Sequence, residues 1–140
     1  MSIDTTFLRS HIASLEAALQ GVGRHRDDDV RRDLYRAACV KEFELVLEQS
    51  GKLLRKRLSP WFASNRQADR LHFKDLFRHA AKHGLMDCDA VERWLRCRDN
   101  RAFPQRDLEE EFLTGTMALL PGFVEDAKAL ASVIEGARDG

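Results

Sequence analysis

The spacing of its apolar residues constrains this chain more than any other feature. Apolar side chains recur every three or four positions almost throughout, and no segment alternates apolar and polar residues as a half-buried strand would. On a helix this spacing gathers the apolar side chains on one face, which has to be buried against another element. With 140 residues, the chain is long enough to bury one hydrophobic core. We therefore predict an all-α fold that forms a single helical-bundle domain over residues 1–140.

Two long helices are predicted in the first part of the chain. An apolar stripe from Leu8 to Val22 defines the first, which ends at the "GVG" of residues 21–23. The aspartates of "RHRDDD" are typical of a helix N-terminus and open a second helix over about 28–58. This helix ends at Ser59-Pro60, because proline cannot continue it.

Three further helices are predicted after these two. One spans about residues 66–83, and a short one opens at a capping box of Asp89 and Glu92. The last runs over about 107–137, and we expect a kink at Pro121. Because the connections are short, neighbouring helices should run antiparallel. The predicted architecture is an up-and-down four-helix bundle plus one short helix.

The composition favours a chain that stays in the cytoplasm. Its first ten residues carry Asp4 and Arg9 and no apolar run, unlike a signal peptide. No stretch approaches the ~18 consecutive apolar residues of a membrane span. The three cysteines are widely spaced, which favours free thiols in a reducing compartment over disulfides. We therefore expect a cytoplasmic protein with no membrane contact.

The net charge is zero, but charges are distributed unevenly along the sequence. Residues 51–106 carry 14 basic and 6 acidic side chains, whereas residues 107–140 carry 2 and 8. The middle of the chain could therefore offer a phosphate-attracting surface beside an acidic C-terminal segment. Alternatively, these opposite charges neutralise each other within the fold.

Arginines concentrate around the stretch "RCRDNRAFPQRDLEEEF" at residues 96–112. Guanidinium groups can hold a phosphate through two parallel hydrogen bonds, and the N-terminus of the last predicted helix would point to the same place. A second interpretation is equally compatible with the spacing: the acids that open this helix cap it and pair with the arginines. The residues concerned are Arg93, Arg96, Arg98, Arg101, Arg106, Asp107, Glu109, Glu110 and Glu111.

Neither a metal site nor a cofactor is predicted. His79 and His83 in "HAAKH" share a helix face as a metal pair would, but Ala80 stands where a zincin has its glutamate. Two ordinary histidines are therefore expected. Cys39 lies beside the apolar face of its helix, which favours a structural thiol over a nucleophile. The basic "KLLRKRL" at residues 52–58 suits a solvated helix face better than a nucleic-acid or membrane surface.

Four segments carry a resemblance to a known family: "RRDLYRAACVKEFELVLEQSGKLLRKRL", "FKDLFRHAAKHGLM", "AVERWLRCRDNR" and "TMALLPGFVEDAKALASVI". They resemble the nucleotidyltransferase substrate-binding proteins of the HEPN superfamily over roughly residues 30–137, and "WLRCRDNR" is the most specific block. The resemblance implies a small helical bundle that forms a homodimer. It also implies pairing with a separate minimal nucleotidyltransferase, often as toxin and antitoxin, and many of the toxins are metal-independent ribonucleases.

The family's signature is an arginine, four residues, a histidine, one residue and a tyrosine. Here the arginine is Arg101, but the histidine position holds Arg106 and the tyrosine position holds Leu108. Metal-free RNA cleavage needs a group that moves protons near neutral pH, which histidine can do and the permanently protonated arginine cannot. In related systems the transferase silences the toxin by adding AMP to the tyrosine, and Leu108 has no hydroxyl. The residues therefore argue against both the ribonuclease chemistry and its switch.

Three functions are compatible with the sequence. The first is a non-catalytic module that partners a minimal nucleotidyltransferase and binds the phosphate of a nucleotide or RNA. Arg98, Arg101 and Arg106 would carry this binding, and Asp99 and Asn100 would orient them. The second is a ribonuclease toxin in which a distant histidine supplies the base. The third is a structural partner whose arginines pair with its own acids. We expect the first, with no catalytic residue and no cofactor.

Overall fold

Helices account for every regular element of the chain within the described residues. The computed structural model describes residues 3–62, 64–102 and 109–136. The longer elements are α1 (Thr6–Arg24), α2 (Asp29–Leu58), α5 (Cys88–Ala102) and α6 (Glu109–Glu135). Between α2 and α5 lie a 3-10 turn, η1 (Ser59–Trp61), and two shorter helices, α3 (Asn65–Asp69) and α4 (Phe73–Lys82). The predicted all-α bundle is confirmed for this part of the chain.

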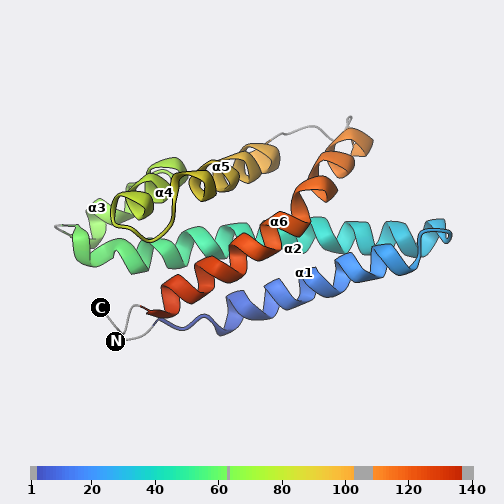
Figure 1. Cartoon of the computed structure of the whole chain (residues 1–140), viewed down its shortest axis with the longest axis horizontal. Helices are drawn as coiled ribbons and strands as arrows, with labels where there is room; N and C mark the ends of the chain where they lie inside the picture. Colours follow the sequence, from blue (N-terminus) through green and yellow to red (C-terminus); the bar gives the residue numbers. More distant parts are fainter. Residues whose placement is uncertain (1–2, 63, 103–108, 137–140) are drawn as a thin grey trace.

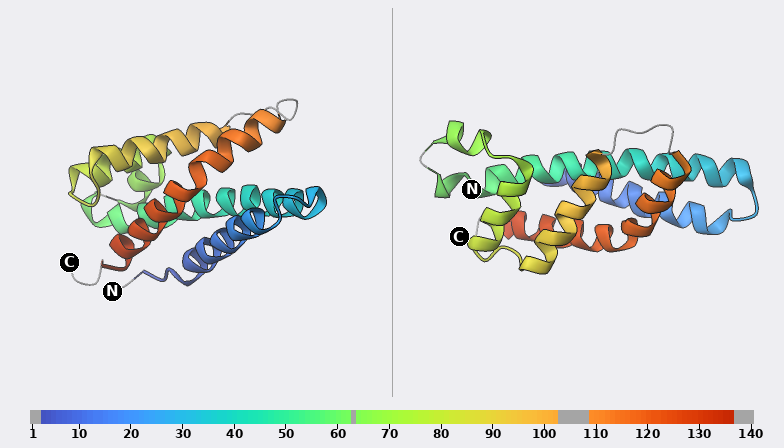
Figure 2. Two further views of the ribbon diagram at one scale, coloured as in Figure 1. Left: turned by 45° about the vertical axis from the view of Figure 1, so that its right-hand side comes forward. Right: turned by 90° about the horizontal axis from the view of Figure 1, so that it is seen from above.

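The α1–α2 hairpin forms the long base of the molecule (Figure 1). α6 packs on both of its helices, while α4 lies along α2 and α5 lies along α6. Seen from above, the turn of the hairpin extends past the ends of the other helices (Figure 2). The start of α1 and the end of α6 lie side by side, because Arg9 donates to the carboxylate of Glu135 at 2.6 and 2.8 Å.

Two helices begin at aspartate caps, one as predicted and one shifted. Asp28 opens α2 and its carboxylate accepts the backbone N–H of Arg31 at 3.1 Å. At α5 the cap is Asp87, which accepts the N–H of Ala90 at 2.8 Å. The predicted capping box at Asp89 is therefore wrong, because Asp89 already lies in the first helical turn. There its charge still suits the helix dipole.

The single helix predicted over residues 66–83 is interrupted. Arg70, Leu71 and His72 separate α3 from α4. A tertiary contact lies at this break, where Nη2 of Arg55 on α2 donates to the backbone carbonyl of Leu71 at 2.9 Å. This carbonyl is thereby hydrogen-bonded outside any helix, and His72 takes an extended conformation before α4 begins.

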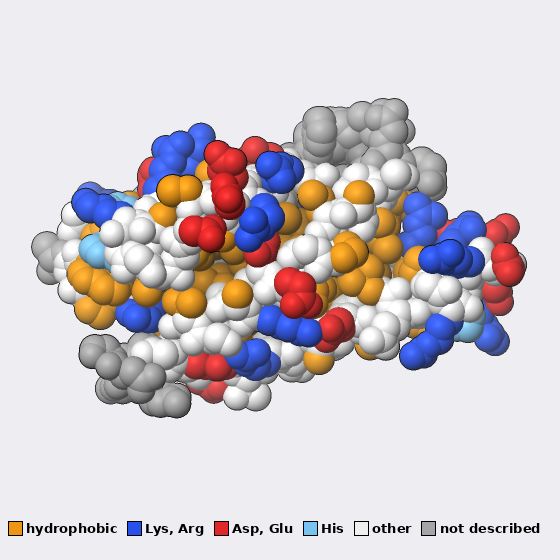
Figure 3. Space-filling view, viewed as in Figure 1, with side chains coloured by type: hydrophobic (Ala, Val, Ile, Leu, Met, Phe, Trp, Pro, Cys, Tyr) orange, Lys and Arg blue, Asp and Glu red, His pale blue; other side chains and the backbone are white. Residues whose placement is uncertain are grey.

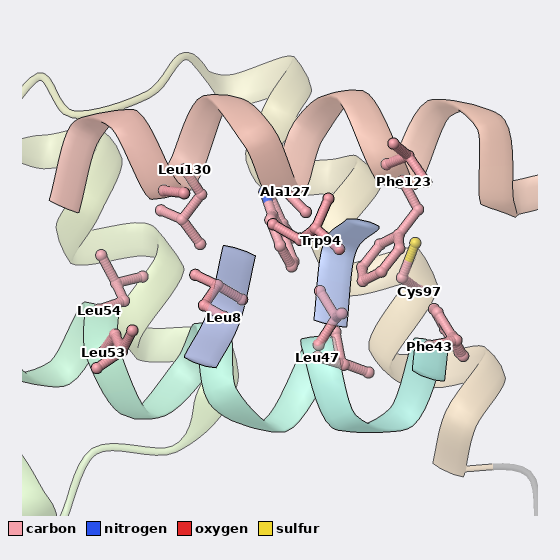
Figure 4. Close-up of a cluster of buried hydrophobic side chains, with 14 of the residues drawn as sticks. Leu8, Phe43, Leu47, Leu53, Leu54, Trp94, Cys97, Phe123, Ala127 and Leu130 are labelled. Atoms are coloured by element: carbon pink, nitrogen blue, oxygen red, sulfur yellow. The ribbon is translucent and has the colours of Figure 1, made fainter. Parts of the chain in front are cut away.

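Four aromatic side chains from four helices pack together in the core, and Figure 4 labels three of them, Phe43, Trp94 and Phe123. Phe123 on α6 meets Phe43 on α2 edge to face at a centroid distance of 4.8 Å, and meets Trp94 on α5 at 5.4 Å. Trp94 also stacks on Phe77 of α4 at 4.9 Å. All four rings are at most 2% exposed. Their packing fixes α5 relative to α2 and α4, which positions the site described below.

Pro121 lies inside α6, and this helix bends along its course (Figures 1 and 2). Proline has no N–H to donate to the carbonyl of Met117, and its ring presses against that turn. The bend directs the second half of α6 across α1 and α2. The kink expected from the sequence accounts for this change of direction.

The free end of the α1–α2 hairpin carries charges of both signs, and apolar side chains reach the surface between α6 and the hairpin (Figure 3). The hairpin charges pair along α2, for example Arg32 with Asp29 at 3.2 Å and Arg36 with Asp33 at 3.5 Å. They therefore largely neutralise each other locally. None of the helices in the described ranges combines the length and the hydropathy needed to cross a membrane.

Candidate functional site

Arg98 reaches from α5 into a groove between α2, α4 and α5. The groove has a volume of about 540 Å³. The guanidinium carbon of Arg98 lies 5.5 Å from the centroid of the Phe73 ring on α4, which is a cation–π contact. Of the five predicted binding residues, Arg98, Asp99 and Asn100 have described side chains.

The Phe73 ring packs against α2 at Gly51. A Cβ atom at this position would lie 3.4 Å from Cδ2 of the ring, which is van der Waals contact. On its other side Phe73 contacts Phe77 at a centroid distance of 4.6 Å. The Phe73 ring, which lines the groove, therefore packs against both α2 and a second ring of α4.

The hydrogen bond from Arg55 to Leu71 also shapes the groove. It ties the segment before α4 to α2, so that His72 lies at the groove with an exposed side chain. His72 is the N-cap residue that precedes α4, and its side chain makes no capping hydrogen bond. A histidine that the sequence did not single out is thus brought beside the predicted Arg98.

The polar lining of the groove is mainly cationic. Lys52, Arg55 and Arg98 are positive, and one carboxylate, Glu48, faces the same space. Without His72, the formal charges of these described lining residues sum to two positive charges. Such a surface attracts an anion, and guanidinium groups are suited to phosphate oxygens in particular. Chemically, the arrangement can bind a phosphate group.

Asn100 and Asp99 have different surroundings. The Nδ2 atom of Asn100 donates to Oγ1 of Thr116 on α6 at 2.8 Å, and Thr116 is fully buried. Asn100 therefore holds the end of α5 against α6, which is a positioning contact. Asp99 on the same turn is exposed to solvent.

The remaining predicted arginines fall beyond the description. Arg101 belongs to the last turn of α5, but its side chain is not described. Arg106 and Leu108 lie entirely outside the described residues. Their proposed correspondence to the family's signature stays a prediction.

Arg93 pairs with an acid of α6 that the sequence analysis did not single out. Its Nε and Nη2 atoms both donate to the carboxylate of Asp126 on α6 at 2.9 Å. This pairing raises the pKa of the Arg93 guanidinium, chiefly through the hydrogen bond. Arg93 therefore joins α5 to α6, whereas Arg98, five residues later, faces the groove. The predicted pairing with Asp107, Glu109, Glu110 and Glu111 concerns side chains outside the described ones, and phosphate binding by Arg98 stays a prediction.

His79 and His83 belong to an aromatic cluster at the end of α4. His83 stacks on Trp61 at 4.2 Å, and His79 meets Phe62 edge to face at 5.1 Å. The guanidinium carbon of Arg57 lies 5.3 Å from the Trp61 ring. Within the described ranges no group of three or more potential metal ligands is present. The histidines thus have ordinary packing roles.

Burial makes two of the cysteines unreactive. Cys39 and Cys97 are buried, and the loss of solvation raises the pKa of each thiol to about 11. A thiol with so high a pKa is a poor nucleophile at neutral pH. Cys88 is the exposed one of the three.

Sequence reasoning missed Lys52, Arg55, His72 and Phe73 as parts of the site. Lys52 and Arg55 belong to "KLLRKRL", which was interpreted as a solvated helix face. The available signal was Gly51 next to this segment, because a glycine inside a helix often allows another element to approach closely. His72 gave no signal, since its position depends on the break between α3 and α4.

Comparisons with known proteins agree with the helical architecture. Residues 5–133 match the family model described as "Nucleotidyltransferase substrate binding protein like". Among solved structures the chain is similar to HI0074 from Haemophilus influenzae, described as revealing the fold of a substrate binding domain of a nucleotidyltransferase. The TM-score is 0.81 at 21% identity, over 94% of this chain and 98% of that chain, which is a likeness of fold. No curated protein matches. The chain belongs to the nucleotidyltransferase substrate-binding protein-like family.

Proposed function

We propose that this chain is a non-catalytic partner of a separate minimal nucleotidyltransferase, for which it holds a nucleotide or an RNA by its phosphate. The observation that carries this proposal is the cationic groove into which Arg98 projects. Arg101 and Arg106 continue the same basic stretch and would add to the binding. Family membership supports the pairing with a transferase.

The proposed unit is a cytoplasmic homodimer bound to the transferase. The "RAFPQRDL" stretch would meet its copy across a two-fold axis, so that the arginines of both chains line a shared cleft. Asn100 supports the stretch through its bond to Thr116 on α6. Phosphate contacts of this kind weaken with added salt, because counterions compete for the same charges.

Binding is tested by fluorescence anisotropy of a labelled short single-stranded RNA at low salt, with mononucleotides as competitors. We expect saturable binding that weakens as salt increases, and a loss of roughly tenfold or more for Arg101→Ala. Arg93→Ala is the matched control, because Arg93 pairs with Asp126. No affinity for RNA or nucleotides at low salt would refute the binding role.

The partner is tested separately by co-expression with a minimal nucleotidyltransferase encoded next to this chain, followed by size-exclusion chromatography. We expect a stable complex that contains two copies of this chain. Separate elution of the two proteins at low micromolar concentration contradicts the partnership. A complex that persists at high salt, without any ligand binding, favours the purely structural role instead.

A second candidate is a metal-independent ribonuclease toxin, and one observation favours it. His72 lines the same groove as Arg98, so a group able to move protons lies beside a group able to stabilise a charged phosphate. In this case the purified chain cleaves bulk tRNA without metal, and His72→Ala removes the activity. Cleavage that survives His72→Ala excludes this assignment.

A further inference from the structure

We propose that the groove between α2, α4 and α5 accepts a terminal phosphate, a phosphomonoester on a body of nucleotide size, in preference to an internal phosphodiester. This inference rests on the proposed function and names the ligand class of its groove. It assigns binding roles to Lys52 and His72 beside Arg98.

The charge of the lining matches a doubly charged phosphate. Among the described lining residues Lys52, Arg55 and Arg98 are positive and Glu48 is negative, so their formal charges sum to two positive charges without His72. A phosphomonoester carries close to two negative charges at neutral pH, whereas an internal diester carries one. Glu48 limits the positive charge and disfavours longer polyphosphates. A single terminal phosphate therefore balances the site best.

The size and the apolar lining suit a compact ligand rather than a long strand. Small-molecule sites typically enclose about 300–1,000 Å³, and this groove has about 540 Å³. Leu47, Phe73 and Leu76 form apolar parts of its lining and can receive the base or sugar. An RNA backbone would instead need a basic track that extends along the surface.

Two of the cations are held in place before any ligand arrives. Arg98 lies over the Phe73 ring, and Arg55 is bonded to the carbonyl of Leu71. Less side-chain freedom is lost when such groups bind a ligand. Lys52 and His72 are exposed and can adjust to the phosphate oxygens. The result is a partly preorganised site with two adaptable donors.

The test is isothermal titration calorimetry of the full chain at low salt with adenosine 5′-monophosphate, 3′,5′-cyclic AMP and adenosine. We expect the monophosphate to bind tightest, the cyclic diester more weakly, and adenosine at least about tenfold more weakly. Equal affinity for the monophosphate and adenosine would overturn the inference. A 5′-phosphorylated trinucleotide, compared with its 5′-hydroxyl form, distinguishes an RNA end from a free nucleotide.

Variants locate the binding. Lys52→Ala and Arg98→Gln should each weaken monophosphate binding by about tenfold. Lys56→Ala is the matched control, because Lys56 is exposed on the same helix and outside the groove lining. Thermal unfolding verifies that each variant folds. Unchanged binding in Lys52→Ala and Arg98→Gln, with a loss in Arg101→Ala, refutes the groove as the binding site, while phosphate binding by the chain through Arg101 still holds. Absence of any phosphate binding refutes both.

Discussion

The guanidinium carbon of Arg98 lies 5.5 Å from the centroid of the Phe73 ring, so a residue near the end of α5 is held by the first residue of α4. The same ring packs against α2 at Gly51. Three helices distant in sequence thus meet around one aromatic ring. Removal of the Phe73 ring should weaken ligand binding, because the Arg98 side chain would then be free to adopt other conformations.

Phe73→Leu should weaken binding of adenosine monophosphate about two- to fivefold. The leucine keeps most of the apolar volume but loses the cation–π contact, which is worth about 0.5–1 kcal/mol at exposed sites. Calorimetry of the variant and the wild type measures the difference. An unchanged affinity would show that the ring does not position Arg98 for binding.

Asn100→Ala should destabilise the fold by about 1–3 kcal/mol, because the hydroxyl of buried Thr116 loses its partner. Urea unfolding monitored by circular dichroism measures this loss. The double variant Asn100→Ala, Thr116→Val should lose less free energy of unfolding than the two single variants together, since it leaves no buried polar group without a hydrogen-bond partner. Additive losses would contradict a direct coupling between the two side chains.

Two glycines of α1 should respond to alanine in opposite ways. A Cβ at Gly21 would lie 2.3 Å from Cδ1 of Tyr35, whereas a Cβ at Gly23 meets nothing within 4 Å. Gly21→Ala therefore displaces the tyrosine ring from its stack on His25 and destabilises the hairpin. Gly23→Ala should stabilise it by up to about 0.5–1 kcal/mol, because alanine is the better helix former. Shifts of the same sign in thermal unfolding would contradict the close approach of Tyr35.

The buried thiols should make stability fall at high pH. Burial raises the pKa of Cys39 and of Cys97 to about 11, whereas an unfolded cysteine has a pKa near ~8.5. The neutral thiols therefore contribute stability that is fully present below the unfolded pKa and is lost as pH rises toward 11. Urea midpoints between about pH 8 and 11 measure the loss, and a Cys39→Ala, Cys97→Ala variant should show a shallower decline.

The same burial should protect these thiols from reagents. In the native protein Cys88 should react rapidly with a thiol-specific dye, whereas Cys39 and Cys97 should react only after unfolding. Rapid native labelling of all three would contradict the packing of α2 and α5.

If the stretch from Arg101 to Leu108 is a ribonuclease motif that has lost its proton-transferring residue, Arg106→His should cleave bulk tRNA without metal. One general acid–base group is worth roughly 10²–10⁴ in rate, which is the gain expected over the native chain. Gel analysis of tRNA incubated with chelator compares the two proteins. Cleavage by the native chain that Arg101→Ala abolishes would show that the native motif is still catalytic.

Much of the fold followed from local sequence patterns. The helix predicted over about 28–58 corresponds to α2, and its cap at Asp28 is where the aspartates indicated. The break between α3 and α4 was not predicted, and Arg55 of another helix binds the carbonyl of Leu71 at this break. The sequence likewise suggested a cap at Asp89, while the backbone used Asp87 two residues earlier.

The sequence by itself determined the all-helical architecture and the apolar face of each helix, because helical periodicity is a property of neighbours along the chain. It also pointed to Arg98 as a binding residue. Only the tertiary structure brought Lys52, His72 and Phe73 beside it and turned Asn100 toward α6. The physical reason is that these contacts depend on how helices cross. The packing of the buried aromatic rings sets how the helices cross, and local sequence patterns do not predict this packing.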